Sequence, residues 1–248
     1  MNAVILAGDN QADVATINVS NKALLNICGR PMVEYVVDAL CESSLIDKIS
    51  IVGPVDLLRK HLGQRVAYYF EEQGSFFENL DAAVQPFRED KSVIIVSSDI
   101  PMITGQVVDD FINRCADKNA DLCYPIVAKK TNQSLFPGFK RTYVKLKEGS
   151  FTGGNMFCIN PRVISACRDF AIKLIEYRKT PWKTAGLLGM DMLTMLMLGR
   201  LSISYIEQRF SKLLNIKAVA IISPFPQLAN DVDKPSDIEM VEKYLSHD

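Results

Sequence analysis

Histidine and paired cysteine are scarce in this chain, and their scarcity narrows the chemistry that it can carry. Two histidines occur among 248 residues, His61 and His247, and the six cysteines contain no C-x-x-C pair. Zinc sites are built mainly from these two residue types, so no such site is expected. Ser97 and Ser98 have no histidine partner in the sequence, so a Ser-His-Asp hydrolase is not indicated.

An excess of charge and a long apolar run are also missing. The formal net charge is −1, which gives no bulk attraction to nucleic acid or to an anionic membrane. The longest apolar stretch, residues 185–199, contains Asp191 and is shorter than the roughly 20 residues of a membrane span. The first residues lack the basic segment and cleavage site of a signal peptide. We therefore expect a cytoplasmic protein that binds no nucleic acid and has no membrane span.

The first half of the chain alternates short apolar runs with helical patterns. Each run is apolar at successive positions, as is typical of strands covered on both faces. The alternation predicts an α/β fold with a mostly parallel, Rossmann-like sheet flanked by helices. Strands are expected at 3–7, 48–53, 66–70 and 92–99, and helices at 31–43, 55–62, 76–87 and 105–116.

The pattern changes in the second half. Residues 129–140 are interpreted as a Gly/Pro loop, residues 161–215 look wholly helical, and a final helix begins near Pro235. We expect one domain, residues 1–248, with a C-terminal helical insert at about 161–215. Further strands are expected at 120–127, 141–149, 155–160 and 216–223.

Three features lie at or soon after the ends of predicted strands: Gly8, Gly74-Ser75 and Asp99. Open α/β sheets bind ligands beyond the carboxyl ends of their strands, so these positions are candidates for a site. Asp99 either holds Mg²⁺, which prefers carboxylate and phosphate oxygens, or caps the following helix. Asp233 precedes the final helix and by itself indicates a helix cap, as does Ser236.

Several short motifs recur in an order that resembles one known family. The segments are "VILAG", a loop ending in Lys22, "GRPM", "SSDIP", "FTGGN" and "DVDKPSDIE". Each is weak alone, but together they span nearly the whole chain and resemble the MobA-like NTP transferases, which are nucleotidyltransferases of the GT-A type. The resemblance implies a GT-A nucleotidyltransferase sheet and a Mg²⁺ cofactor.

The resemblance also implies roles for individual residues. Those facing the nucleotide would be Leu6, Ala7, Gly8, Lys22, Gly74, Ser75 and Asn79. Those beside the acceptor would be Gly153, Gly154 and Asn155, and Mg²⁺ would lie between Asp99 and Asp233. Alternation along 141–147 places Arg141 on a strand face that is usually solvated, although a phosphorylated acceptor could use it.

The first loop departs from the family pattern. Asp9 stands where the family has a second glycine, and no Gly or Arg lies between Gly8 and Lys22. Glycines in such loops let backbone N–H groups approach phosphate closely, so a weak or specialised phosphate loop is expected. Lys22 either neutralises phosphates or is an ordinary exposed loop lysine.

The favoured function is Mg²⁺-dependent transfer of NMP from an NTP to a small acceptor, with release of pyrophosphate. A phosphorylated acceptor is favoured because its anionic oxygen needs no general base, which fits the scarcity of histidine. Two alternatives stay open: a GT-A glycosyltransferase that consumes a nucleotide sugar, and a degenerate, non-catalytic nucleotide-binding module.

Residues 187–214 are too apolar for a helix with one face in water. Neighbouring helices of the insert could cover this stretch. It could instead form the interface of a homo-oligomer, or receive an apolar acceptor on flexible methionines.

Overall fold

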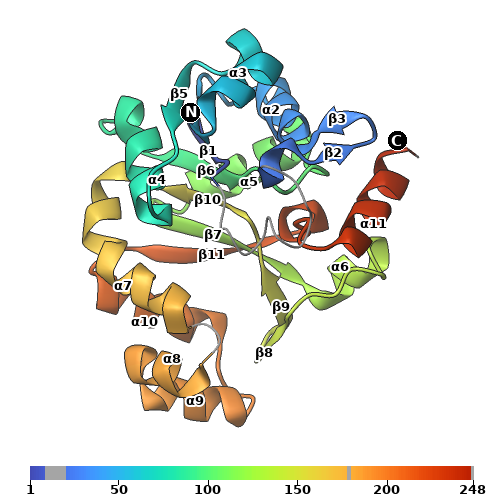
Figure 1. Ribbon diagram of the computed structural model, residues 1–248. Coiled ribbons are helices and arrows are strands. Elements are labelled where there is room, and N and C mark those ends of the chain that lie inside the picture. The colour runs from blue at the N-terminus through green and yellow to red at the C-terminus, as the bar shows by residue number, and fades with distance from the viewer. Residues whose placement is uncertain (9–20, 178–179, 247–248) are drawn as a thin grey trace.

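The structure is a computed structural model that describes residues 1–8, 21–177 and 180–246. Among these residues, nine strands form one sheet with the order β5-β4-β1-β6-β10-β7-β9-β8, and β11 pairs with β7. Helices flank this sheet (Figure 1). The strands are β1 (Asn2–Leu6), β4 (Ile49–Gly53), β5 (Tyr68–Glu71), β6 (Val93–Ser97), β7 (Leu122–Ala128), β8 (Val144–Leu146), β9 (Gly149–Gly153), β10 (Met156–Ile159) and β11 (Ala218–Ser223).

The centre of the sheet is mostly parallel, which confirms the predicted α/β class. β1 pairs in parallel with β4 and β6, and β4 pairs in parallel with β5. β11 runs parallel to β7, whereas β10 is antiparallel to both β6 and β7. β10 thus starts at the edge of the sheet where the parallel strands end.

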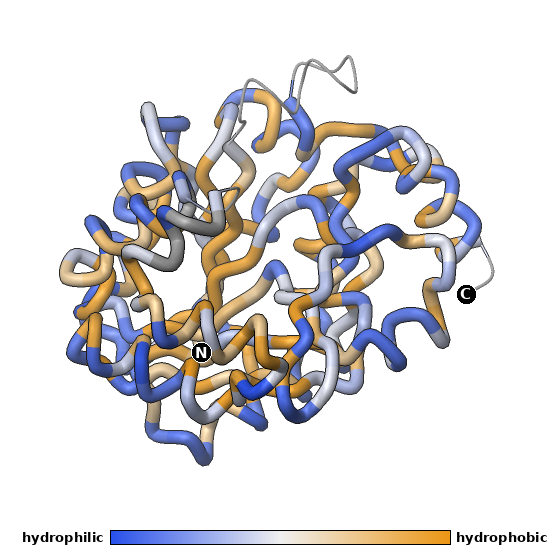
Figure 2. The backbone as a smooth tube through the Cα atoms, turned by 90° about the horizontal axis from the view of Figure 1, so that it is seen from below, coloured by the Kyte–Doolittle hydropathy of each residue, from blue (hydrophilic) through white to orange (hydrophobic). Residues whose placement is uncertain are grey.

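Both faces of the parallel strands are buried, which explains why these strands are apolar at successive positions. Ala3 and Ile5 of β1 pack in one cluster with residues of α2 (Met32–Glu42), α3 (Val55–Leu62) and α5 (Gly105–Ala116). Val4, on the opposite face, packs in a second cluster with residues of α4 (Phe76–Val84). Figure 2 shows orange, hydrophobic stretches through the middle of the molecule.

The helices of the first half lie where the sequence predicts them. They are α2 (Met32–Glu42), α3 (Val55–Leu62), α4 (Phe76–Val84) and α5 (Gly105–Ala116). Thr104 caps α5 by accepting a hydrogen bond from the Val107 amide, so Asp99 is not a helix cap. A short antiparallel pair, β2 (Asn26–Ile27) and β3 (Arg30–Pro31), packs beside α11 (Pro235–Leu245).

The cap predicted for the final helix is wrong. The carboxylate of Asp237 accepts hydrogen bonds from the backbone amides of Asp233 and Lys234, both at 3.0 Å. Asp237 therefore stabilises the start of α11, and the side chain of Asp233 is left for another role.

The loop predicted over residues 129–140 is in part a helix, α6 (Lys129–Leu135). Asn132 of this helix is completely buried, and it accepts a hydrogen bond from Asn230. Pro137 and Gly138, the residues that suggested a loop, lie after the end of this helix.

The single strand predicted at 141–149 is a hairpin of β8 and β9 instead. Gly149 has φ of +145°, a conformation that favours glycine. Arg141 and Tyr143 precede β8, so the solvated strand face expected for Arg141 does not exist.

In the part of the chain that the structure describes, residues 161–215 contain several separate helices. They are α7 (Ile164–Tyr177), α8 (Pro181–Leu188), α9 (Met190–Met197) and α10 (Ile203–Leu214). Gly189 (φ +109°) and Gly199 (φ +64°) lie at the breaks on either side of α9. Figure 1 shows α8 and α9 at the end of the molecule far from α3.

Part of the apolar surface of α9, and the leucine that follows it, is not covered by neighbouring elements. Met190, Met197 and Leu198 are 58%, 78% and 63% exposed. The idea that the helical segment buries all its own apolar side chains is therefore wrong for these three residues. Of the helices in the described part of the chain, none has the length and apolar character needed to cross a membrane.

Candidate active site

The carboxyl ends of the parallel strands bring the predicted site segments to one edge of the sheet. Leu6 is in register with Val52 and with Ser97 on the two neighbouring strands. The Ser98 amide donates to the Leu6 carbonyl at 3.1 Å, so the backbone pairing continues past both strand ends. The segments that lead to Gly8 and to Asp99 are thus adjacent.

Lys22 is held against this edge by its neighbour. Asn21 donates through its side-chain amide to the Ala7 carbonyl at 3.0 Å and accepts from the Ala23 amide at 2.9 Å, which caps the short 3₁₀ helix Lys22–Leu24. Lys22 is only 8% exposed. The interpretation of Lys22 as an exposed loop lysine is therefore wrong.

The ammonium group of Lys22 lies between two carboxylates from distant parts of the chain. Its Nζ is 2.7 Å from Asp99 Oδ2 and 2.8 Å from Asp233 Oδ1. Asp99 also accepts from the Ser97 hydroxyl at 2.5 Å. The structure therefore brings together three predicted residues: Lys22 and the two candidate metal ligands.

A third carboxylate, that of Asp231, belongs to the same cluster. Oxygen atoms of Asp99, Asp231 and Asp233 lie within 4.8 Å of one another. The Val232 amide donates to the Asp99 carbonyl at 2.9 Å, which fixes the segment carrying Asp231 and Asp233 next to β6. Sequence reasoning missed Asp231 as a site residue, although the Asp-x-Asp spacing in an extended segment was a usable signal.

Arg141 and Asn155 both contact Asp231. Arg141 Nη1 is 2.7 Å from Asp231 Oδ1, and its Nη2 donates to the Asp231 carbonyl at 2.7 Å. The side-chain amide of Asn155 donates to Asp231 Oδ1 at 2.9 Å. Two residues predicted beside the acceptor are therefore connected through Asp231 to the carboxylate cluster.

The cluster changes the proton affinities of its members. Burial raises the pKa of Asp231 to about 7, with the nearby charge of Asp99 adding to the effect and Arg141 opposing it. Burial by itself would raise the pKa of Asp233, but hydrogen bonds from Asp231 and Lys22 outweigh this effect and lower that pKa. Burial by itself would lower the pKa of Lys22, yet the charges and hydrogen bonds of Asp99 and Asp233 raise that pKa above its ordinary value.

The donor set fits a hard divalent cation. Three carboxylates in close proximity offer the oxygen ligands that Mg²⁺ prefers. The Lys22 ammonium neutralises part of this charge at present, so a metal ion and Lys22 would compete for the same oxygens.

Two of the positions predicted to face the nucleotide, Gly8 and Asn79, lie next to each other. A Cβ atom added to Gly8 would lie 2.6 Å from Asn79 Nδ2, so a larger residue there would require the Asn79 side chain to move. Asn79 Oδ1 accepts from the Gln73 amide at 2.6 Å, which orders the turn before Gly74. Ser75 caps α4 by accepting from the Glu78 amide.

The other predicted glycines have packing roles. A Cβ atom on Gly154 would lie 3.1 Å from the Leu228 carbonyl oxygen, and one on Gly153 would clash with the Tyr124 hydroxyl. Backbone hydrogen bonds of Gly154 and Asn155 to Pro125 and Leu228 fix this turn. The depleted phosphate loop, residues 9–20, lies outside the described residues.

Comparisons with known proteins agree on one kind of domain. The sequence profile of the MobA-like NTP transferase domain matches residues 3–173. The bifunctional protein GlmU of Bacillus velezensis is 31% identical over 102 residues, which are 40% of this chain and 22% of that protein. This match thus covers about a fifth of the length of that relative.

Solved structures extend the likeness to nearly the whole chain. A hypothetical transferase from Thermus thermophilus is 34% identical, covers 96% of this chain and 98% of its own, and superposes with a TM-score of 0.84. A provisional glucose-1-phosphate thymidylyltransferase from Bacillus anthracis is 16% identical, with coverage of 100% and 96% and a TM-score of 0.62. At that identity the second likeness concerns the fold alone.

Proposed function

Because the chain belongs to the MobA-like NTP transferase family, we propose that it transfers NMP from an NTP to a small phosphorylated acceptor. The acceptor oxygen attacks the α-phosphorus of the NTP, a new P–O bond forms, and the bond to the β-phosphate oxygen breaks. Pyrophosphate leaves with the electron pair of that bond. The observation that supports this proposal most is the buried Lys22 ammonium between Asp99 and Asp233 at the carboxyl edge of the sheet.

Lys22 is proposed to exchange carboxylate partners for phosphate oxygens when the nucleotide binds. Its charge is already positioned at the strand ends, where ligands of open α/β sheets bind. Positioning and charge neutralisation contribute most to reactions of this kind, which suits a site without histidine among its described residues.

Asp99, Asp231 and Asp233 are the residues proposed to hold Mg²⁺. The metal would neutralise the charge on the phosphate oxygens of the bound nucleotide. Within the cluster, Ser97 orients Asp99, while Arg141 and Asn155 orient Asp231. Leu6, Ala7, Gly8, Gly74, Ser75 and Asn79 remain the proposed nucleotide contacts.

The acceptor is proposed to lie on the side of Asp231. Arg141 contacts Asp231 on this side, and Gly153, Gly154 and Asn155 follow one another at the end of β9. A guanidinium group can bind a phosphate with two hydrogen bonds, which would require Arg141 to share its contacts with Asp231.

The test is pyrophosphate release from each of the four NTPs with a panel of sugar phosphates, in the presence of Mg²⁺. One NTP and acceptor pair should support turnover, and Asp99→Asn should reduce it by at least about 10²-fold. Asp169→Asn, an exposed aspartate in α7, serves as the matched control and should keep full activity.

Other outcomes separate the alternatives. Consumption of a nucleotide sugar without pyrophosphate release would identify a glycosyltransferase. Nucleotide binding without turnover of any pair would indicate a non-catalytic module.

A further inference from the structure

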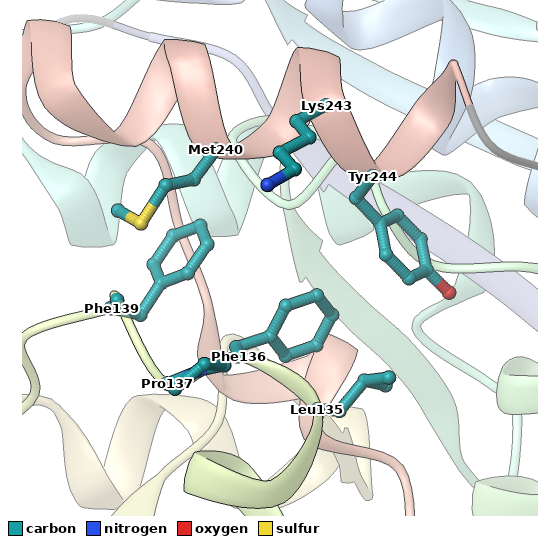
Figure 3. A pocket seen from close by; sticks show the side chains of 8 residues that line it. Leu135, Phe136, Pro137, Phe139, Met240, Lys243 and Tyr244 are labelled. Carbon is teal, nitrogen blue, oxygen red and sulfur yellow. The ribbon is translucent and has the colours of Figure 1, made fainter.

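A cavity of about 530 Å³ lies between α11 and the segment that follows α6. Its volume is within the range of small-molecule sites, roughly 300–1,000 Å³. Phe136 and Phe139 contribute from one side, and Met240, Lys243 and Tyr244 contribute from α11 on the other (Figure 3). None of the carboxylates of the candidate active site lines it.

Three aromatic rings form the walls. The ring centroids of Phe136 and Phe139 are 5.6 Å apart with an interplanar angle of 75°, and those of Phe136 and Tyr244 are 5.1 Å apart at 59°. Faces and edges of aromatic rings that meet at such angles favour another aromatic ring as a neighbour. The cavity is therefore suited to a flat, aromatic ligand.

These walls are held in place from behind. Phe136 and Phe139 are each 5% exposed and pack in a cluster with Val232 and Val241. The Tyr244 hydroxyl accepts a hydrogen bond from the Gln227 amide at 3.1 Å. Because the rings are already fixed, a ligand would lose little free energy in ordering them.

Lys243 is the one charged residue among the described residues that line the cavity. Figure 3 shows the Lys243 side chain reaching from α11 toward the space above Phe136. The Arg141 guanidinium carbon is 5.8 Å from the Phe139 ring centroid. No acidic residue is among those that line the cavity. A ligand with one anionic group is thus favoured over a neutral or cationic one.

The same segment connects the cavity to the carboxylate cluster. Phe139 is two residues before Arg141, and Arg141 binds Asp231. At the other end, Asn132 of α6 accepts from Asn230, whose side-chain oxygen accepts from Arg141 Nε at 3.3 Å. A ligand bound against Phe139 would therefore change the surroundings of the Arg141 guanidinium, which lies 5.8 Å from that ring.

We propose that this cavity is an effector site for a small planar aromatic anion, and that its ligand acts on the candidate active site through Arg141. Binding of the ligand in this cavity does not depend on the proposed function. Only the expectation that the ligand alters turnover of the acceptor rests on the proposed function.

Binding is tested by calorimetric titration with 2-naphthoate and with its neutral analogue 2-naphthamide. The wild type should bind 2-naphthoate more tightly. Lys243→Met should weaken that binding about threefold to tenfold and leave 2-naphthamide unchanged, whereas Lys60→Met, an exposed lysine of α3, should change neither. Equal affinity for both probes, or an equal effect of both lysine variants, would overturn the proposed ligand class.

Gly138→Ala tests the location of the site. A Cβ atom there would lie 2.6 Å from Met240 Sδ and would push this side chain aside. Binding of both probes should weaken while the far-ultraviolet circular dichroism stays unchanged. Undiminished binding in this folded variant would show that the probe binds elsewhere.

The connection to Arg141 is tested without any assay of activity. In nitrogen NMR spectra, the Arg141 side-chain signal, identified by its loss in Arg141→Lys, should shift on addition of 2-naphthoate. A signal that stays in place at saturation would refute the proposed action through Arg141. If no nucleotide substrate is found, this readout still distinguishes a failed effector site from a failed proposed function.

Discussion

Replacement of Lys22 by methionine tests the central feature of the candidate site. Methionine keeps most of the length of the side chain and removes the ammonium group. The side chains of Lys22 and Asp99 are only 11% and 18% exposed, whereas that of Asp233 is 48% exposed. The two ion pairs of Lys22 therefore differ in what they contribute.

The magnitude follows from these exposures. Loss of one partner from a buried ion pair costs about 3–5 kcal/mol, and a surface pair is worth about 0–1 kcal/mol. Ser97 still donates to Asp99, which reduces the cost of leaving this carboxylate without its cation. We expect Lys22→Met to lower the free energy of unfolding by about 2–3 kcal/mol near neutral pH.

The stability lost in Lys22→Met should be smaller at acidic pH than near neutral pH. In the wild type, hydrogen bonds from Asp231 and Lys22 lower the pKa of Asp233 against the effect of burial. The part that Lys22 contributes to stability is therefore present above the ordinary carboxylate pKa of about 4 and is lost as pH falls below it. Added Mg²⁺ should restore stability more in Lys22→Met than in the wild type, because the cation can replace the ammonium between the carboxylates.

Urea unfolding measured with EDTA or with excess Mg²⁺ provides the assay. Lys60→Met, in an exposed position, should stay within about 0.5 kcal/mol of the wild type. If Lys22→Met behaves like this control at neutral pH, the buried ion pairs do not exist in solution and the reasoning fails.

Three further changes test other parts of the structure. The pKa of Asp231 is raised to about 7 from the ordinary 3.8. The protonated Asp231 therefore contributes stability that is full below about pH 4 and lost as pH rises through about 7, and Asp231→Asn should be more stable than the wild type between about pH 5 and 8, by at most about 4 kcal/mol. Parallel urea titrations that show no such gain would contradict the shift. Gly8→Ala should cost about 1–3 kcal/mol because its Cβ would meet Asn79 Nδ2, and calorimetry should find most of this cost absent in an Asn79→Ala background. If the exposed surface of α9 forms the homo-oligomer predicted from the sequence, light scattering should detect a dimer that Met197→Asp dissociates, and a wild type that is monomeric at high micromolar concentration would rule this interface out.

The parallel half of the sheet could be predicted from local patterns. Its strands are apolar at successive positions because both faces are covered, and the helices between them have amphipathic spacing and are long enough for crossovers. Since parallel strands end at one edge, the positions after them, such as Gly8 and Asp99, were candidates for a common site before their contacts were known. The family resemblance added Lys22 and Asp233.

Contacts between residues far apart in the sequence could not be read in this way. Lys22 meets Asp233 across 211 residues, and Arg141 meets the Asp231 backbone across 90. Burial of Lys22 and the role of Asp231 follow from these contacts, and no local pattern carries them. The helix α6 replaced a predicted loop for a similar reason, since Asn132 is buried against Asn230 from a distant segment.

The exposed apolar side chains of α9 and of Leu198, which follows it, show a case in which the sequence pattern predicted burial that the structure does not have. Composition alone indicated that residues 187–214 would be covered, because one continuous apolar helix cannot keep a face in water. Gly189 and Gly199 adopt positive φ and divide the stretch into short helices, so Met197 and Leu198 can remain exposed. Periodicity along the chain determines which residues share a face, but the packing of separate elements determines whether that face is covered.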